Sequence, residues 1–285
     1  MNKISINMLK GPFQHDICSS ALNKNKYVEW SKDKSSDISC HIDYALLDTP
    51  DASKENYGWI CESSVIVPTV IKEVIKNKSL YKRRFKYIFT CDERVVNIDK
   101  DLFKFTLPSA LPWIQKKKIY KKNKLVSFIG SNKRMCKGHL YRQEMIEKYK
   151  HKVDHYGRGF KDKELPWLTT EEGVEESGKI LGLKDYMFSF AMENTNHKFA
   201  FCEKTTDCFA TGTIPIYWGG KGIIKYFDKD GIIFLDDLKS IDDLTEDLYN
   251  SKMKNIMNNF EKLNDLLSSE DYFALNYMRG HNDNV

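Results

Sequence analysis

The chain has 285 residues, of which 41% are hydrophobic and 13% aromatic, and this composition is typical of a folded globular protein. Lys and Arg total 45 against 40 Asp and Glu, so the net charge of +5 is a small excess for so many charged residues. The longest apolar runs are far too short to span a bilayer, and the N-terminal stretch MNKISINMLKG contains no secretory hydrophobic region. We therefore expect no transmembrane segment and no export.

The seven cysteines are odd in number and show no CxxC spacing, which argues against a disulfide framework and against a zinc site. Such cysteine usage indicates a reducing compartment, so we expect a cytoplasmic protein. Basic residues cluster at 72–86 and 116–124, and a nucleic-acid-binding protein would place such patches on phosphates. A solvated helix face and a charged linker explain the same clusters, and we favour this explanation over a nucleic-acid partner.

Short β-prone runs alternate with helical runs along the first part of the chain. The predicted strands cover residues 3–9, 43–47, 57–61, 86–90 and 104–108. Apolar residues recur near helical spacing over 69–81, which predicts a helix there. The following segment QKKKIYKKNK is a highly charged connector with little to bury.

The same alternation continues after the connector. The runs LVSFIGS and KVDHYG indicate strands on either side of an amphipathic helix, HLYRQEMIEKYK. YMFSFAMEN then predicts a strand, EKTTDCFATG a helix that Gly212 ends, and TIPIYWG another strand. Units of this kind predict α/β domains with parallel sheets covered by helices. We divide the chain into an N-terminal domain over residues 1–115, a linker over 116–124 and a C-terminal domain over 125–285 with a helical tail.

The usual phosphate-binding and hydrolase motifs are missing, because the chain contains no GxxxxGK[ST], GxGxxG, HExxH or GxSxG. What remains is a strand that ends at Glu193-Asn194, a loop of eight residues, and Glu203-Lys204 at the start of a helix. A helix N-terminus offers free N–H groups and the positive end of the dipole. A lysine in that first turn is poor for helix stability but favours a bound pyrophosphate, so this pattern indicates a ligand site.

The segment YMFSFAMENTNHKFAFCEKTTDCFATGTIPIYWGG resembles the donor-site signature of the family-10 glycosyltransferases, the α-1,3/4-fucosyltransferases. The resemblance is strongest over residues 184–238, continues back to Leu125, and reaches the N-terminal third only through WICESSVIVP. It implies a GT-B architecture, in which two Rossmann-like domains face a cleft. It further implies an inverting transferase that moves fucose from GDP-fucose to a hydroxyl of a glycan acceptor.

The resemblance also assigns the donor-binding residues. Asn194 then faces the donor phosphates, Glu203 holds a ribose or sugar hydroxyl, and Lys204 contacts the pyrophosphate. Arg142, on the helix after Ser131-Asn132, matches a family arginine that reaches the phosphates. Positive groups aimed at the leaving diphosphate stabilise the transition state, so the proposed chemistry needs no metal ion and no cofactor.

Two residues depart from the family pattern, and one assignment lies outside the signature. Ala200 and Cys202 stand where the family has Tyr and Thr, which leaves stacking on the base to Phe199 or Phe201. The catalytic base is predicted to be Glu62, which follows a short apolar strand and matches a family glutamate that takes the acceptor proton. Asp92 and Glu93, at the end of another strand, are the reserve candidates.

Each assignment has a simpler alternative. Glu203 and Lys204 also fit an exposed helix start, Asn194 a turn cap, Arg142 a surface ion pair, and Glu62 a cap of the helix that begins near Pro68. Two further functions stay open beside the fucosyltransferase: a GT-B transferase that uses a different nucleotide sugar, and a non-catalytic sugar- or nucleotide-binding protein with this fold.

Overall fold

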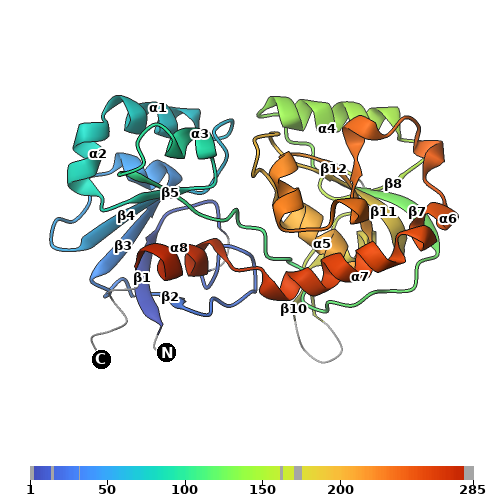
Figure 1. Ribbon diagram of the computed structural model, residues 1–285, viewed down its shortest axis with the longest axis horizontal. Helices are drawn as coiled ribbons and strands as arrows, with labels where there is room; N and C mark the ends of the chain where they lie inside the picture. Colours follow the sequence, from blue (N-terminus) through green and yellow to red (C-terminus); the bar gives the residue numbers. More distant parts are fainter. Residues whose placement is uncertain (1–2, 14–15, 32, 161–162, 170–174, 279–285) are drawn as a thin grey trace. The chain divides into compact units, whose positions relative to one another are not determined.

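The computed structural model describes residues 3–13, 16–31, 33–160, 163–169 and 175–278. Contacts divide the chain into two compact units, and each unit is an α/β structure built on one parallel sheet (Figure 1). The first unit contains the residues up to Ser109 together with those from Leu267 onwards, and the second runs from Ala110 to Leu266. Within the described residues we find no helix with the length and hydrophobicity of a membrane span.

The sheet of the first unit has six parallel strands in the order β2-β1-β3-β4-β5-β6. The strands are β1 (Ile4–Leu9), β2 (Val28–Trp30), β3 (Ile38–Ile42), β4 (Glu55–Ile60), β5 (Ile88–Thr90) and β6 (Phe103–Phe105). The winding direction reverses between β1 and β3, and in open α/β sheets ligands bind outside the carboxyl ends of the strands at such a switch point.

Helices cover both faces of this first sheet. They are α1 (Pro68–Lys76), α2 (Lys78–Arg84), the short α3 (Glu93–Val96), α8 (Ser269–Tyr277) and the 3₁₀ helix η1 (Asp43–Leu47). Successive residues of a strand point to opposite faces, so Ile88 packs with α1 and α2 while Phe89 packs with α8. The Phe89 ring stacks on Phe273 of α8 with the centroids 4.4 Å apart.

Two predictions for the first unit differ from the structure. The strand predicted over 43–47 is wrong, because these residues form the 3₁₀ helix η1. Asp43 has a positive φ of 50°, and this left-handed residue turns the chain away from the sheet at the end of β3. The single helix predicted over 69–81 is two helices, which meet at Asn77.

The second unit contains a five-stranded parallel sheet in the order β13-β12-β11-β7-β8. Its strands are β7 (Lys124–Ile129), β8 (Asp154–Tyr156), β11 (Tyr186–Met192), β12 (Ile214–Trp218) and β13 (Ile233–Phe234), and a separate antiparallel pair is formed by β9 (Leu168–Thr169) and β10 (Glu175–Glu176). The winding direction reverses between β7 and β11, so this is the switch point of the second unit. The predicted strand over 186–194 and helix over 203–212 are confirmed.

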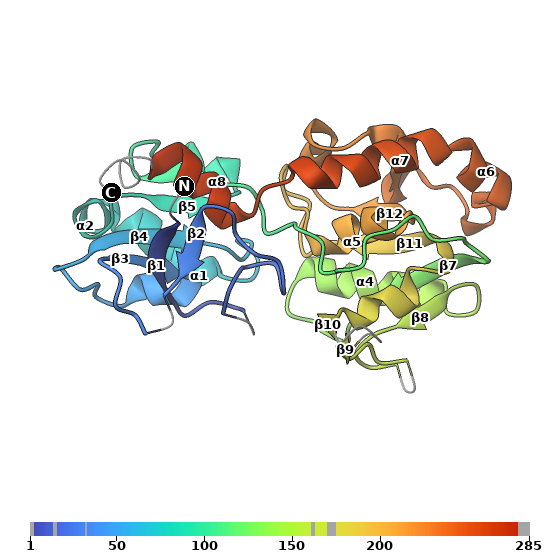
Figure 2. The ribbon, with the colours of Figure 1, turned by 90° about the horizontal axis from the view of Figure 1, so that it is seen from below.

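The helices of the second unit lie on both faces of its sheet, as Figures 1 and 2 show. They are α4 (Lys137–Lys148), α5 (Glu203–Thr211), α6 (Glu246–Ser251) and α7 (Met253–Lys262), with 3₁₀ helices η2 (Gly178–Gly182), η3 (Lys221–Lys225), η4 (Lys229–Gly231), η5 (Leu235–Asp237), η6 (Ile241–Asp243) and η7 (Leu263–Asp265). Phe190 packs towards α4, and its neighbour Ala191 packs towards α5. The α5 helix is buried from Thr205 to Thr211.

The charged segment over 116–124 belongs to the second unit, where the sequence suggests a linker. Its backbone is tied to the end of α5, since the N–H groups of Lys118 and Tyr120 donate to the carbonyl oxygens of Ala210 and Thr211. The Lys122 side chain turns inwards, and its ammonium donates to four oxygens, from Leu183, Lys184, Thr211 and Thr213. Burial lowers the pKa of Lys122 to about 7, and the hydrogen bonds to these four oxygens offset the cost of burying the side chain.

The helical tail also lies outside the predicted domain, because α8 packs into the first unit. The reason is a set of buried acids. The Glu270 carboxylate accepts hydrogen bonds from the backbone and the hydroxyl of Ser19, each at 2.7 Å. The Asp271 carboxylate accepts from the N–H groups of Lys26 and Tyr27, each at 2.8 Å. Buried carboxylates need such partners, so these contacts fix the helix to the segment between β1 and β2.

Candidate active site

The residues at the carboxyl end of β11 form the centre of the candidate site in the second unit. Arg142 reaches this point from α4, and its guanidinium donates to the carbonyl oxygen of Met192 at 2.7 Å and to Asn194 Oδ1 at 3.3 Å. Arg142 is only 4% exposed, which excludes the alternative of an ion pair on a surface helix. The structure therefore brings Arg142 and Asn194 together at the switch point between β7 and β11.

A glycine makes this approach possible. A Cβ atom at Gly138, in the first turn of α4, would lie 2.2 Å from the carbonyl oxygen of Asn194. The N-terminal turn of α4 therefore rests directly on the backbone after β11. This close packing carries Arg142, one turn further along α4, to the end of β11.

Lys204 lies in the first turn of α5, beside the same strand end. Its ammonium is 2.8 Å from the Cys202 sulfur and 3.5 Å from a carboxylate oxygen of Glu193. Glu193 is buried and accepts hydrogen bonds from both the backbone N–H and the thiol of Cys202. Burial and the Glu193 charge raise the pKa of the Cys202 thiol well above its usual value, so the thiol stays protonated and serves as a donor.

Glu203 is held by a lysine that sequence reasoning missed. Lys179, on η2, places its ammonium 2.9 Å from Glu203 Oε1 and 3.0 Å from Asp207 Oδ2. Burial opposes ionisation, but the charges of Lys179 and Lys204 outweigh it and hold the pKa of Glu203 far below its usual range. Glu203 is therefore a fixed anion that accepts hydrogen bonds, the chemistry expected of a group that binds a sugar hydroxyl.

The aromatic residues of the loop are not available for stacking. Phe199 and Phe201 are 4% and 2% exposed, and both pack against Tyr226. The prediction that one of them stacks on a base is therefore wrong. The glycines after β12 serve the same loop: a Cβ atom at Gly220 would lie 1.9 Å from the carbonyl oxygen of His197, so the glycine turn packs against the loop backbone.

Glu62 lies in the first unit, two residues after the end of β4. Its backbone N–H, like that of Cys61, donates to the buried carboxylate of Asp43, at 3.2 Å and 2.9 Å respectively. Burial, with a smaller contribution from the Glu62 charge, raises the pKa of Asp43 to about 7. Asp43 directly follows β3 at the switch point of this sheet, so the two acids gather where such sheets bind ligands.

The alternatives near Glu62 are less consistent with the structure. The helix α1 begins after Val67, so Glu62 does not cap it. Of the reserve candidates, Asp92 is the N-cap of α3, accepting from the Arg94 backbone, and it also pairs with the Arg94 guanidinium at 2.6 Å. The Asp92 carboxylate therefore has a structural role of its own.

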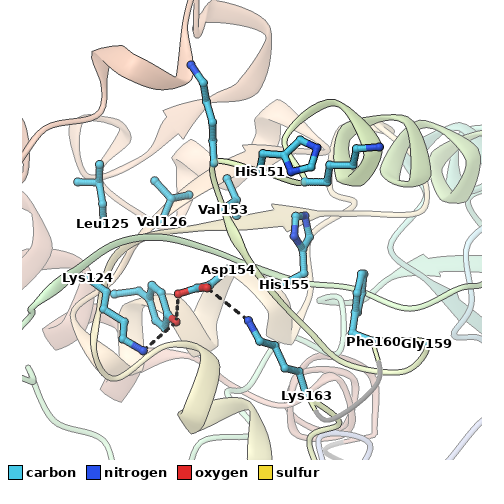
Figure 3. A pocket seen from close by; sticks show the side chains of 13 residues that line it. Lys124, Leu125, Val126, His151, Val153, Asp154, His155, Gly159, Phe160 and Lys163 are labelled. Atoms are coloured by element: carbon cyan, nitrogen blue, oxygen red, sulfur yellow. Dashed lines mark hydrogen bonds and ion pairs between the residues drawn. The ribbon is translucent and has the colours of Figure 1, made fainter.

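A cavity of about 770 Å³ lies elsewhere in the second unit, at the start of β7 and β11 and along β8 (Figure 3). In its wall, Asp154 accepts from Tyr186 at 2.7 Å and pairs with Lys163 at 3.3 Å, while Lys124 donates to the Tyr186 hydroxyl. None of the predicted donor-binding residues lines this cavity. We base the candidate site on the carboxyl ends of the strands, because the charged groups described above converge there.

The family model for the C-terminal part of glycosyltransferase family 10 (fucosyltransferase) matches residues 119–264. The α-(1,3)-fucosyltransferase FucT of Helicobacter pylori is 32% identical over 71 residues, which cover 25% of this chain and 15% of that relative. A crystal structure of an α1,3-fucosyltransferase with GDP has a TM-score of 0.50 and 14% identity, and the match covers 99% of this chain and 92% of that one. Another, an α1,3-fucosyltransferase with GDP-fucose, has a TM-score of 0.46 and 16% identity, covering 90% and 82%.

The two α/β units, together with the similarity to the crystal structure of the α1,3-fucosyltransferase with GDP, define the class of protein: the fold is that of the GT-B glycosyltransferases. Within this class the family is also shown, since the matched segment is more than half of the chain. The chain belongs to glycosyltransferase family 10, the fucosyltransferase family.

Proposed function

We propose that this protein is an inverting fucosyltransferase that moves fucose from GDP-fucose to a hydroxyl of a glycan acceptor. The observation that carries the proposal is the convergence of Arg142, Asn194 and Lys204 at the carboxyl end of β11. Family membership supports fucose as the sugar, and a structural neighbour was crystallised with GDP. We further propose that the protein acts in the cytoplasm and has no nucleic-acid partner.

The donor diphosphate is the group that this cluster suits. Cleavage of the sugar–phosphate bond builds negative charge on the leaving GDP, and fixed cations around it lower the barrier. Arg142 is held in place by Met192 and Asn194, and the Lys204 ammonium lies among Cys202, Glu193 and Glu203. In our proposal these two cations neutralise the diphosphate without a metal ion, and Glu203 accepts a hydrogen bond from a ribose or fucose hydroxyl.

The acceptor hydroxyl needs a base on the opposite face of the sugar, which is what makes the reaction inverting. We assign this role to Glu62 of the first unit. Its backbone N–H donates to the buried Asp43, which fixes the chain two residues after the end of β4. A base of this kind contributes about 10²–10⁴-fold to the rate.

The test is turnover with GDP-fucose and a panel of galactose- and N-acetylglucosamine-containing glycans. Released GDP measures transfer, and NMR of the product gives the anomeric configuration. We expect GDP release that depends on an acceptor and an inverted linkage. Saturable binding of GDP-fucose without acceptor-dependent release, across the panel, would favour the non-catalytic alternative, and turnover with another nucleotide sugar alone would favour a different donor.

A further inference from the structure

A pair of tryptophans stands beside the candidate donor site and has no role in the mechanism so far. Trp113 and Trp167 stack with their ring centroids 6.1 Å apart and an interplanar angle of 21°. Trp167 is 45% exposed, and no other aromatic side chain among the described residues of the second unit is as exposed. Flat ligands stack on aromatic rings, so an open ring on a stacked pair offers a surface for such a ligand.

The pair is attached to the helix that carries Glu203. The backbone N–H groups of Trp113 and Ile114 donate to Asp207 Oδ1 at 2.6 Å and 3.1 Å. The Lys179 ammonium lies 4.2 Å from the centroid of the Trp113 ring, and the same ammonium bridges Asp207 and Glu203. The first turns of α5, Lys179 and the tryptophans are thus one connected group, fixed by an ion-pair network and a cation–π contact.

The aromatic residues nearer in sequence do not serve as a stacking surface. Phe199 and Phe201 are buried under Tyr226, as described above. If Glu203 holds the ribose of a nucleotide, the base attached to that ribose needs a partner close to Glu203. Lys179 connects Glu203 to Trp113, and Trp167 adds the exposed face.

We propose that the exposed face of Trp167, backed by Trp113, stacks on the guanine base of the donor, and that Lys179 is the positioning residue that couples this platform to Glu203. The inference rests on the proposed function, because the ligand is the GDP part of GDP-fucose. Aromatic stacking on a base is tolerant of sequence and contributes about five- to a hundredfold in affinity per base. The two tryptophans, which we call the platform, therefore supply affinity for the nucleoside. Arg142 and Lys204, the diphosphate clamp, supply affinity only for the diphosphate.

The experiment compares a ligand that has a base with one that lacks it. GDP and inorganic pyrophosphate are titrated calorimetrically into the wild-type protein, Trp167→Ala and Trp167→Phe. Met257→Ala, which removes a 54% exposed side chain from α7, is the matched control. We expect Trp167→Ala to bind GDP about five- to a hundredfold more weakly with an unchanged affinity for pyrophosphate, and Trp167→Phe to keep most of the GDP affinity. GDP should also quench the tryptophan fluorescence of the wild type but much less that of Trp167→Phe.

Lys179 is tested through the pH dependence of GDP binding. Without its charge, the Glu203 pKa rises, so Lys179→Met should lose GDP affinity as the pH falls towards the ordinary range of a carboxyl group, about 4. Asp207 shares the Lys179 ammonium and burial raises its pKa, so we expect the loss at low pH to be larger in Lys179→Met than in the wild type, and Lys179→Arg to resemble the wild type. A pH-independent loss in Lys179→Met would mean that Lys179 only supports the fold.

Three results would overturn the Trp167 assignment. GDP affinity that is unchanged in Trp167→Ala would exclude stacking, and an equal loss for GDP and pyrophosphate would mean that Trp167 only holds its loop. A raised KM for the acceptor with normal GDP affinity would assign the platform to the acceptor. If the wild-type protein binds another nucleoside diphosphate and not GDP, the proposed donor is wrong, but the same comparison with pyrophosphate still tests Trp167.

Discussion

The two units share one strand order at the centre of their sheets, yet they hold their candidate residues in different ways. In the second unit, each candidate side chain has a side-chain partner of its own: Arg142 contacts Asn194, Glu203 pairs with Lys179, and Lys204 pairs with Glu193. In the first unit, the backbone N–H of Glu62 donates to a buried acid, Asp43. A donor clamp needs several fixed charges around one anion, whereas proton removal needs one well-placed carboxylate, so the contrast matches two different tasks.

The largest effect should come from the first unit. Glu62→Gln keeps the shape of the side chain but removes the base, so we expect the single-turnover rate to fall about 10²–10⁴-fold while GDP-fucose affinity is unchanged. Glu29→Gln, at an exposed position on β2, is the control. Near-normal transfer by Glu62→Gln would eliminate this base, and a loss of donor binding would break the proposed division of tasks between the units.

Asp43 should give the first unit a pH dependence of its own. Its pKa is about 7 in the folded protein against 3.8 for the ordinary group. The folded state therefore holds a proton that the unfolded state releases between these values, and the contribution to stability is lost as the pH rises through this window. Asp43→Asn keeps the acceptor for the Glu62 backbone but does not titrate. Urea unfolding at about pH 4 and pH 8 should show the wild type losing on the order of 3 kcal/mol relative to the variant. Parallel pH profiles for the two proteins would show that Asp43 is ionised in the fold.

For the diphosphate clamp, Arg142 and Lys204, we expect smaller losses of donor affinity or turnover from each single substitution. Lys204→Ala and Arg142→Ala each remove charge-assisted hydrogen bonds of ~1.5–3 kcal/mol, so donor affinity or turnover should fall about ten- to a hundredfold. Lys239→Ala, an exposed lysine of the same unit, should be neutral. Calorimetry and steady-state kinetics measure both effects. Wild-type kinetics in either clamp variant would remove that residue from the site.

Gly138→Ala tests the position of Arg142 in the second unit without changing any charge. The added methyl group meets the Asn194 carbonyl at 2.2 Å, so α4 must shift away from β11. We expect about 1–3 kcal/mol of destabilisation and weaker donor binding, because Arg142 moves with the helix. Chemical unfolding and GDP titration check the two consequences. An unchanged stability would show that the contact between α4 and Asn194 is loose.

The sequence predicts the strand β11 and the helix α5 of the second unit well because these elements are adjacent along the chain. The strand β11 and the helix α5 are joined by a short loop, so Asn194, Glu203 and Lys204 form a local pattern that resemblance can identify. Arg142 is more distant, and only the resemblance indicated it. The remaining partners could not be predicted in this way, because folding alone brings Lys179 to Glu203 and Trp113 to Asp207.

The errors have the same physical origin. The Lys-rich segment before β7 reads as a solvated linker, but Lys122 finds four oxygen acceptors around the end of α5. The C-terminal helix reads as a tail of the second unit, but Glu270 and Asp271 bind residues some 250 positions earlier in the chain. No local pattern records such distant partners. The strand predicted at 43–47 has suitable residues, and the left-handed Asp43 overrides them.

The central claim is that a guanine nucleotide binds through the diphosphate clamp of the second unit. The most direct measurement is the melting temperature of the wild-type protein with saturating GDP, GDP-fucose or UDP. A ligand at a hundred times its Kd stabilises the folded state by about 2.7 kcal/mol, which is a readily measured shift. We predict that GDP and GDP-fucose raise the melting temperature clearly more than UDP does. Strong stabilisation by UDP, with none by GDP or GDP-fucose, would contradict the account.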